Sequence, residues 1–97
     1  MNNPLITVFT PTFNRVDFLP KVYSSLKKQE YRDFEWLIVD DGSSDNTETV
    51  INDFILEDEI LIHYIKQPNS GKHKAINKGV SVAKGELFLI LDSDDTV

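Results

Sequence analysis

The sequence predicts an α/β domain whose core is a sheet of four mainly parallel strands, joined by about three helices. The alternation of two kinds of segment leads to this fold class. Short segments rich in apolar, β-branched and aromatic residues alternate with stretches whose apolar residues recur at helical spacing. That alternation is typical of parallel sheets with right-handed helical crossovers. The 97 residues contain no repeat and no linker, so we expect one domain or part of one.

The expected strands are bounded by turn-forming residues and differ in how apolar they are. The first is Leu5–Thr10, which Pro11 is expected to end. The other three are Phe34–Asp40, Ile60–Ile65 and Glu86–Leu91. Because the second and fourth are almost continuously apolar, we expect both of their faces to be covered.

Two of the expected helices have residues that favour a defined start. The first follows Asp17 as its N-cap, and its apolar positions are Phe18, Leu19, Val22, Tyr23 and Leu26. The second opens at Asp45, and Glu48 three residues later predicts a capping box. Its apolar positions are Val50, Ile51, Phe54 and Ile55.

The third expected helix runs from Gly71 to Lys84, and Gly85 is expected to end it in a left-handed conformation. Its predicted buried face consists of Ala75, Ile76, Gly79, Val80 and Ala83. A glycine inside a helix costs about 1 kcal/mol relative to alanine. Either a close approach of helix and sheet or simple tolerance explains Gly79.

The composition excludes several functional classes. There are no cysteines, which excludes disulfides and cysteine-ligated zinc. No apolar run approaches the roughly 18 to 20 residues that span a bilayer, and the first residues do not resemble a secretory signal. These features fit a cytoplasmic protein, and membrane association through segments outside this chain stays open. The net charge of −6 argues against nucleic acid as a partner.

The candidate site lies at the carboxyl ends of the strands, because parallel strands all end at one edge of the sheet and ligands bind there. The acidic run from Asp92 to Asp95 directly follows the fourth strand. Carboxylates in this position favour a hard divalent cation, Mg²⁺ or Mn²⁺, that bridges a diphosphate. A solvated acidic turn is the alternative.

Two further groups at this edge favour a nucleotide. Asp40 and Asp41 end the second strand, and one of them can accept a hydrogen bond from a base or ribose; a simple turn is the alternative. Lys72, His73 and Lys74 form a basic cluster at a helix start that can contact phosphate, or they are merely solvated. Neither a P-loop nor a Gly-x-Gly-x-x-Gly motif is present.

His63 is expected to be a packed or edge residue rather than a ligand, and Trp36 is expected to pack in the core or at the sheet edge. His63 lies inside the third expected strand and Trp36 inside the second. The positions of the two histidines in the chain do not support a Ser/His/Asp arrangement.

Four motifs, taken together, resemble the family 2 glycosyltransferases. In order along the chain they are Ile6–Arg15, Leu37–Asp45, Asn69–Lys72 followed by Ala75, Asn77 and Gly79, and Leu91–Asp95. They cover almost the whole chain, and their order makes the resemblance specific. It implies a Rossmann-like GT-A fold with strand order 3-2-1-4. Residues 1–97 would then be a partial domain, the N-terminal nucleotide-sugar-binding part.

The resemblance also implies roles for single residues. Thr10 and Asp41 match positions that contact the base, usually uracil, Asp94 matches the ribose or metal position, and Asp95 matches the metal position. Asp92 is a neighbouring candidate, and Lys72 or Lys74 matches a basic residue near the base or diphosphate. The remaining candidate nucleotide-binding residues are Pro11, Thr12, Asn14, Arg15 and Asp40.

The family transfers a sugar from a nucleotide-diphosphate donor to an acceptor hydroxyl with inversion, and it depends on a divalent metal. The resemblance therefore implies a UDP-sugar donor and a glycan or lipid-linked acceptor in polysaccharide or cell-envelope glycan synthesis. The general base of the family lies beyond the position of Val97, so we expect this chain alone to be inactive. An uncovered fourth strand is expected to promote self-association.

Three other functions fit an α/β domain with acidic strand ends less well. A receiver-like signalling module carries its paired acids after the first strand, where this chain has Thr10, Pro11 and Thr12. A sugar-nucleotide pyrophosphorylase would need a glycine-rich basic loop at the same place. A non-catalytic interaction domain that retains the fold is the third alternative, and the acidic run argues against it.

Overall fold

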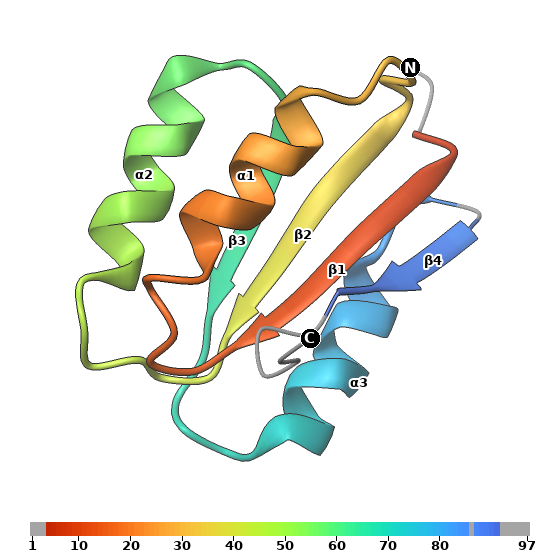
Figure 1. Cartoon of the computed structure of the whole chain (residues 1–97). Coiled ribbons are helices and arrows are strands. Elements are labelled where there is room, and N and C mark those ends of the chain that lie inside the picture. The colour runs from red at the N-terminus through yellow and green to blue at the C-terminus, as the bar shows by residue number, and fades with distance from the viewer. Residues whose placement is uncertain (1–3, 86, 92–97) are drawn as a thin grey trace.

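A computed structural model of the chain describes residues 4–85 and 87–91, and within them it contains four strands and three helices (Figure 1). In chain order the elements are β1 (Ile6–Thr12), α1 (Leu19–Lys27), β2 (Phe34–Asp40), α2 (Thr47–Glu57), β3 (Leu61–Lys66), α3 (Lys72–Val82) and β4 (Leu87–Ile90). The strands pair in parallel in the order β3-β2-β1-β4. The predicted α/β class and the strand order 3-2-1-4 are confirmed.

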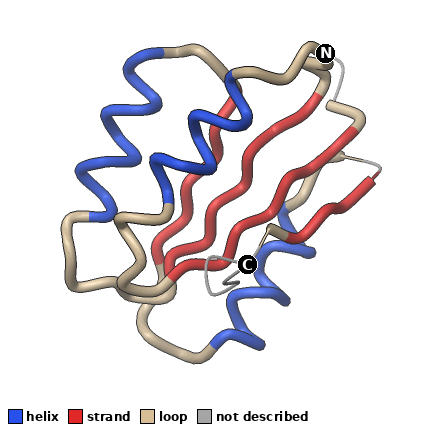
Figure 2. The backbone as a smooth tube through the Cα atoms, viewed as in Figure 1, coloured by secondary structure: helices blue, strands red, loops and turns tan. Residues whose placement is uncertain are grey.

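The sheet lies between two helical layers, with α1 and α2 on one face and α3 on the other (Figure 2). Strand β2 is central, and all seven of its residues are buried, as its apolar sequence predicted. Trp36 belongs to the core on the α1 and α2 side, where it stacks with Tyr23 and Phe54. Its indole N–H donates to the Thr10 hydroxyl at 3.0 Å, so the prediction that Trp36 is a packing residue is confirmed.

Strand β1 extends two residues beyond the predicted end and includes Pro11. The Phe9 carbonyl accepts from Leu91 on the β4 side, and the Thr12 carbonyl accepts from Asp41 on the β2 side. Because backbone groups alternate sides along a strand, the Pro11 nitrogen faces the β4 side. Pairing with β4 has already ended at Phe9, so the proline interrupts no ladder hydrogen bond there.

The predicted helix starts are wrong for α1 and α2. The N-cap residues are Phe18 and Asn46, and neither cap has a side-chain hydrogen bond. Asp45 lies one residue before the α2 cap, and its carboxylate accepts from the Thr47 and Val16 backbone N–H groups. Tertiary contact between two loops therefore replaces the expected capping box.

Glycines position α3 and β4 by allowing close packing. A Cβ on Gly79 would lie 2.3 Å from the Phe9 ring, which explains this glycine by close approach of helix and sheet. A Cβ on Gly85 would lie 2.4 Å from the Thr7 nitrogen. The prediction of a left-handed Gly85 is wrong, because among the described glycines only Gly42 and Gly71 have positive φ. The predicted buried face of α3 is also wrong at Val80, which is 59% exposed.

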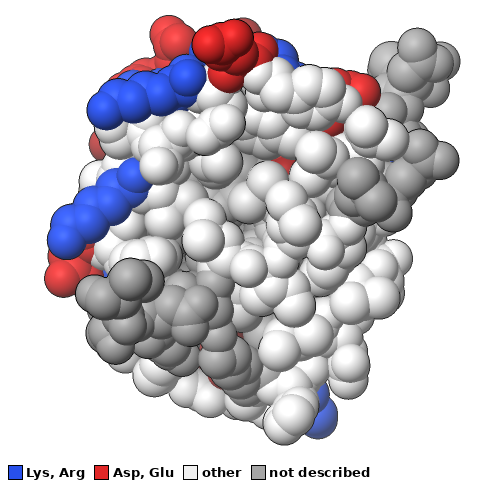
Figure 3. All heavy atoms as spheres, turned by 45° about the vertical axis from the view of Figure 1, so that its right-hand side comes forward, with Lys and Arg blue, Asp and Glu red and all other residues white. Residues whose placement is uncertain are grey.

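Among the described residues, strand β4 forms an edge of the sheet and is only half covered, so the prediction that both of its faces are covered is wrong there. Phe88 packs on the α3 side, but Leu89 and Ile90 are more than half exposed. A groove of about 480 Å³ lies beside them, lined on its other side by Leu26 and Tyr31 among others. This side of the molecule presents a broad uncharged surface (Figure 3). In the described part of the chain, no helix has the length and apolar character that crossing a membrane requires.

Candidate functional site

The loops that follow β1, β2 and β3 meet at the carboxyl edge of the sheet, at the bottom of Figure 1. The strand register places Thr12 beside Asp40, and Asp40 beside Lys66. Residues from three separate crossovers therefore adjoin at one edge. Hydrogen bonds between side chains and backbone then join these loops to one another.

Asn14 connects the β1–α1 loop to the β2–α2 loop. It has a left-handed backbone with φ of 53°, a conformation that asparagine tolerates better than most residues. Its side-chain Oδ1 accepts from the Ser44 N–H at 2.7 Å and from the Asp45 N–H at 3.3 Å. Its own N–H donates to the Ser43 hydroxyl at 2.8 Å. Asparagine at this position thus holds the loop that follows Asp41.

Asp40 is completely buried and organises the end of β2. Its Oδ1 accepts from the Ser43 N–H at 2.9 Å, and its Oδ2 accepts from the Tyr64 hydroxyl at 2.6 Å. Burial and the adjacent Asp40 carboxylate raise the pKa of Tyr64, so the phenol stays protonated and donates. Both Asp40 oxygens are therefore used inside the protein.

Asp41 holds the loop between β3 and α3. Its Oδ1 accepts from the Gln67 side-chain amide at 3.0 Å and the Ser70 N–H at 2.8 Å, and its Oδ2 accepts from the Gly71 N–H at 2.9 Å. Burial acts to raise the pKa of Asp41, but these three hydrogen bonds lower it below its ordinary value. Asp41 is therefore a carboxylate at neutral pH.

This carboxylate keeps some capacity to bind a ligand. A carboxylate offers about four acceptor positions, and three are occupied at Asp41. The remaining position suits an N–H or O–H donor. Gly71 is the N-cap of α3, so Asp41 also lies at the positive end of that helix.

Gly42 brings the β2–α2 and β3–α3 loops into direct contact. Its φ is +80°, and a Cβ there would lie 2.7 Å from the Asn69 nitrogen. A larger residue would separate the two loops. Contacts among the β1–α1, β2–α2 and β3–α3 loops therefore form the candidate site at this edge of the sheet.

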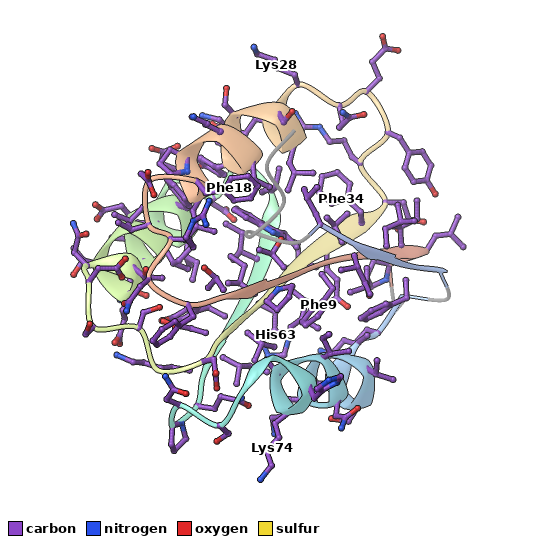
Figure 4. The ribbon with its side chains drawn as sticks, turned by 60° about the horizontal axis from the view of Figure 1, so that its bottom comes forward. Phe9, Phe18, Lys28, Phe34, His63 and Lys74 are labelled. Carbon is purple, nitrogen blue, oxygen red and sulfur yellow. The ribbon has the colours of Figure 1, made fainter. Side chains whose placement is uncertain are left out.

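The other predicted site residues differ in how accessible they are. Thr10 and Pro11 are buried, and Arg15 is half-buried. The Thr12 hydroxyl is the one buried side-chain polar atom in the described residues without a hydrogen-bond partner. Lys74 is exposed in the first turn of α3, and its side chain points away from the sheet (Figure 4).

Several predicted residues lie outside the described part of the chain. Asp92, Asp94 and Asp95 follow residue 91, and the Lys72 side chain is likewise not described. The described residues hold no group of three or more His, Cys, Asp or Glu side chains that could bind a metal. The predicted metal ligands Asp94 and Asp95 therefore stay predictions.

Sequence reasoning missed the residues that support the acids. Gln67, Ser70 and Tyr64 all contact Asp40 or Asp41. The only signals were their position at or after the third strand and, for Ser70, its place in the Asn69–Lys72 motif, because these hydrogen bonds join residues that are far apart in the chain. The sequence predicts His63 as a packed or edge residue, and it is half-buried in strand β3, on the face that α3 covers.

Comparison with known proteins identifies the family to which a chain with this fold and this candidate site belongs. Residues 7–97 match glycosyl transferase family 2, and the chain belongs to that family. A GalNAc(5)-diNAcBac-PP-undecaprenol β-1,3-glucosyltransferase of Campylobacter jejuni is 35% identical, with 95% of this chain and 30% of the relative covered. The chain spans about a third of the length of the curated relatives it matches.

Solved structures of glycosyltransferases share the fold. A mannosyltransferase of Pyrobaculum calidifontis in complex with GDP-Man and Mn²⁺ superposes with a TM-score of 0.86 at 26% identity, covering 97% of this chain and 28% of that chain. TarS 1-349 of S. aureus in complex with UDP-GlcNAc has a TM-score of 0.83 at 30% identity, covering 92% and 26%. The fold is therefore GT-A, as the sequence motifs implied.

Proposed function

We propose that this chain forms the donor-binding part of an inverting glycosyltransferase that uses a UDP-sugar. The observation that carries the proposal is the ionised, buried Asp41, which accepts three hydrogen bonds from the β3–α3 loop and has one further acceptor position that no described residue fills. The uracil ring has one N–H group that such an acceptor can bind. The UDP-GlcNAc complex of TarS, a structural neighbour, supports this choice of donor.

A divalent metal, Mn²⁺ or Mg²⁺, is part of the proposal. Asp95 and Asp94 would hold it, with Asp92 as a neighbour, because carboxylates at the carboxyl end of a strand provide the hard oxygen ligands these ions prefer. Bound there, the metal would neutralise charge on the diphosphate as the sugar leaves. The Mn²⁺ complex of the mannosyltransferase neighbour supports this part.

The acceptor site and the general base are proposed to lie in the part of the relatives' length that this chain does not span. The base would deprotonate an acceptor hydroxyl, which then attacks the anomeric carbon with inversion. The undecaprenol-linked substrate in the name of the Campylobacter jejuni relative supports a lipid-linked or glycan acceptor in cell-envelope synthesis. A cytoplasmic location, with membrane association through other segments, completes the proposal.

We further propose that the uncovered β4 edge pairs with a second copy of this chain. Within the described residues β4 ends the sheet, and Leu89 and Ile90 beside it are exposed. Unpaired backbone and apolar side chains together favour strand addition. Sedimentation should show a dimer that Ile90→Lys converts to a monomer, whereas a wild-type monomer at high concentration contradicts the pairing.

Calorimetric titration of UDP tests the main proposal. Binding should require Mn²⁺ and be lost in Asp95→Ala, whereas Asp53→Ala, which removes an exposed carboxylate from α2, should bind as wild type does. Equal binding by both variants would exclude Asp95 as a metal ligand. Absence of UDP binding by the wild type would contradict a donor site formed by this chain.

A further inference from the structure

The inference rests on the proposed donor site and concerns Asn14, which sequence reasoning counted among the nucleotide-binding residues. We propose that Asn14 is a positioning residue that holds the β2–α2 loop in the form that binds the nucleotide. Its Oδ1 accepts from the consecutive Ser44 and Asp45 N–H groups and lies 3.4 Å from the Ser44 hydroxyl. That oxygen is therefore committed to the protein.

The contact between the two loops is reciprocal. Asp45, whose N–H is held by Asn14, returns a hydrogen bond to the first loop by accepting from the Val16 N–H at 3.2 Å. The Asn14 N–H adds a bond to the Ser43 hydroxyl. We call residues 14–16 and 43–45, with these bonds, the clasp.

The clasp fixes one side of the segment that carries Asp41. On its other side, Gly42 packs against the Asn69 backbone and Asp41 itself binds the Ser70 and Gly71 N–H groups. Residues 41–45 are thus held between the β1–α1 loop and the β3–α3 loop. Release of the clasp frees the Ser44 and Asp45 amides and loosens the segment two residues from Asp41.

The backbone at Asn14 explains why asparagine suits this position. Its left-handed φ excludes most side chains, and glycine would fit without strain but provides no acceptor. Aspartate keeps Oδ1 and removes the Nδ2 donor. Asn14→Gly therefore removes the clasp, whereas Asn14→Asp keeps it and removes only the amide donor. Comparing the two variants distinguishes a role in the clasp from direct contact of the amide with the nucleotide.

Asp58 offers a matched control. It is the other described non-glycine residue with positive φ, at 56°, and it is the C-cap residue of α2, at the end of that helix farthest from the clasp. Asp58→Gly therefore makes the same backbone change without touching the clasp.

The experiment measures UDP affinity by calorimetry and amide hydrogen exchange by NMR in the wild type and these three variants. Asn14→Gly should weaken UDP binding about tenfold and speed exchange at Ser44 and Asp45 by a similar factor. Asn14→Asp should restore slow exchange and most of the affinity, and Asp58→Gly should leave both unchanged.

Each contrary outcome has a distinct meaning. Equal loss of affinity in Asn14→Gly and Asn14→Asp, with unchanged exchange at Ser44 and Asp45, would overturn the clasp in favour of direct contact. Faster exchange in Asn14→Gly with wild-type affinity would also overturn it, because the loop would then not matter for binding. Absence of UDP binding by the wild type would instead refute the proposed function, and the exchange data would still report on the clasp.

Discussion

Strand β2 has a buried carboxylate near each of its ends, and the molecule uses the two differently. At the amino end, Glu35 accepts from the Thr7 hydroxyl at 2.6 Å and the Lys84 N–H at 2.8 Å, and the Thr7 hydroxyl in turn accepts from Gly85. At the carboxyl end, Asp41 accepts from three donors of the β3–α3 loop. Both carboxylates tie a crossover to the sheet.

The surroundings of the two carboxylates explain the difference in use. Around Glu35 the crossover is packed so tightly that a Cβ on Gly85 would lie 2.4 Å from the Thr7 nitrogen, which leaves no room for a ligand. Asp41 is surrounded by loops at the open edge of the sheet and has one acceptor position left. The same chemistry therefore serves the scaffold at one end and, in the proposed function, a donor-binding site at the other.

The largest expected effect is a loss of stability when the carboxylate at the amino end of β2 is removed. Glu35→Ala leaves the Thr7 hydroxyl and the Lys84 N–H without their buried acceptor, which should lower the free energy of unfolding by about 3 kcal/mol. Urea denaturation measures this, with the exposed Glu30→Ala as a control that should change it little. UDP affinity of the folded variant should stay within about twofold of wild type. A tenfold loss of UDP affinity in Glu35→Ala would contradict the view that Glu35 serves only the scaffold while Asp41 serves the site.

The next largest expected effect is a loss of UDP affinity when the carboxylate at the carboxyl end of β2 is replaced. Asp41→Asn replaces the acceptor of the Gly71 N–H with an amide donor and removes the charge, so UDP affinity should fall at least about tenfold. The free energy of unfolding should fall by only about 1–2 kcal/mol, because the loop can open to water. Calorimetry and urea denaturation on the same sample measure both. Unchanged affinity would exclude Asp41 from the donor site.

A smaller effect appears in the pH dependence of stability. The pKa of Asp41 is lower in the folded chain than its ordinary value of about 3.9. Its contribution to stability is therefore complete above about pH 5 and is lost as the pH falls through the folded pKa. Denaturation between about pH 2.5 and 7 should show the wild type and Asp41→Asn converging in acid. Parallel curves would contradict the lowered pKa.

The sequence was sufficient to predict the scaffold but not the contacts within the site. Phe34–Asp40 was predicted with the observed bounds because a strand buried on both faces is continuously apolar. The predicted start of α2 is wrong because Asp45, a good cap by local rules, accepts a hydrogen bond from Val16 in a loop 29 residues earlier. The location of Asp40 and Asp41 at the carboxyl edge of the sheet was predictable from the parallel topology alone.

Distance along the chain explains what was missed. The partners of Asn14 lie 29 to 31 residues away, and those of Asp41 lie 26 to 30 residues away. No local pattern reports such pairs. Gly85 was correctly noted but assigned a left-handed turn, because only the packing against Thr7 reveals its need for close approach.

The smallest expected effect tests how far the site extends along α3. Lys74 is exposed and points away from the sheet (Figure 4), so it can act on the diphosphate only through a long-range field that salt screens. Lys74→Ala should therefore weaken UDP binding by about twofold at low salt and not measurably at about 0.5 M salt. Lys78→Ala, one turn further along the same helix and also exposed, is the control and should have a smaller effect. A tenfold loss in Lys74→Ala that persists at high salt would mean that its side chain turns inward to contact the nucleotide, which would extend the site from the Asp41 loops onto the helix.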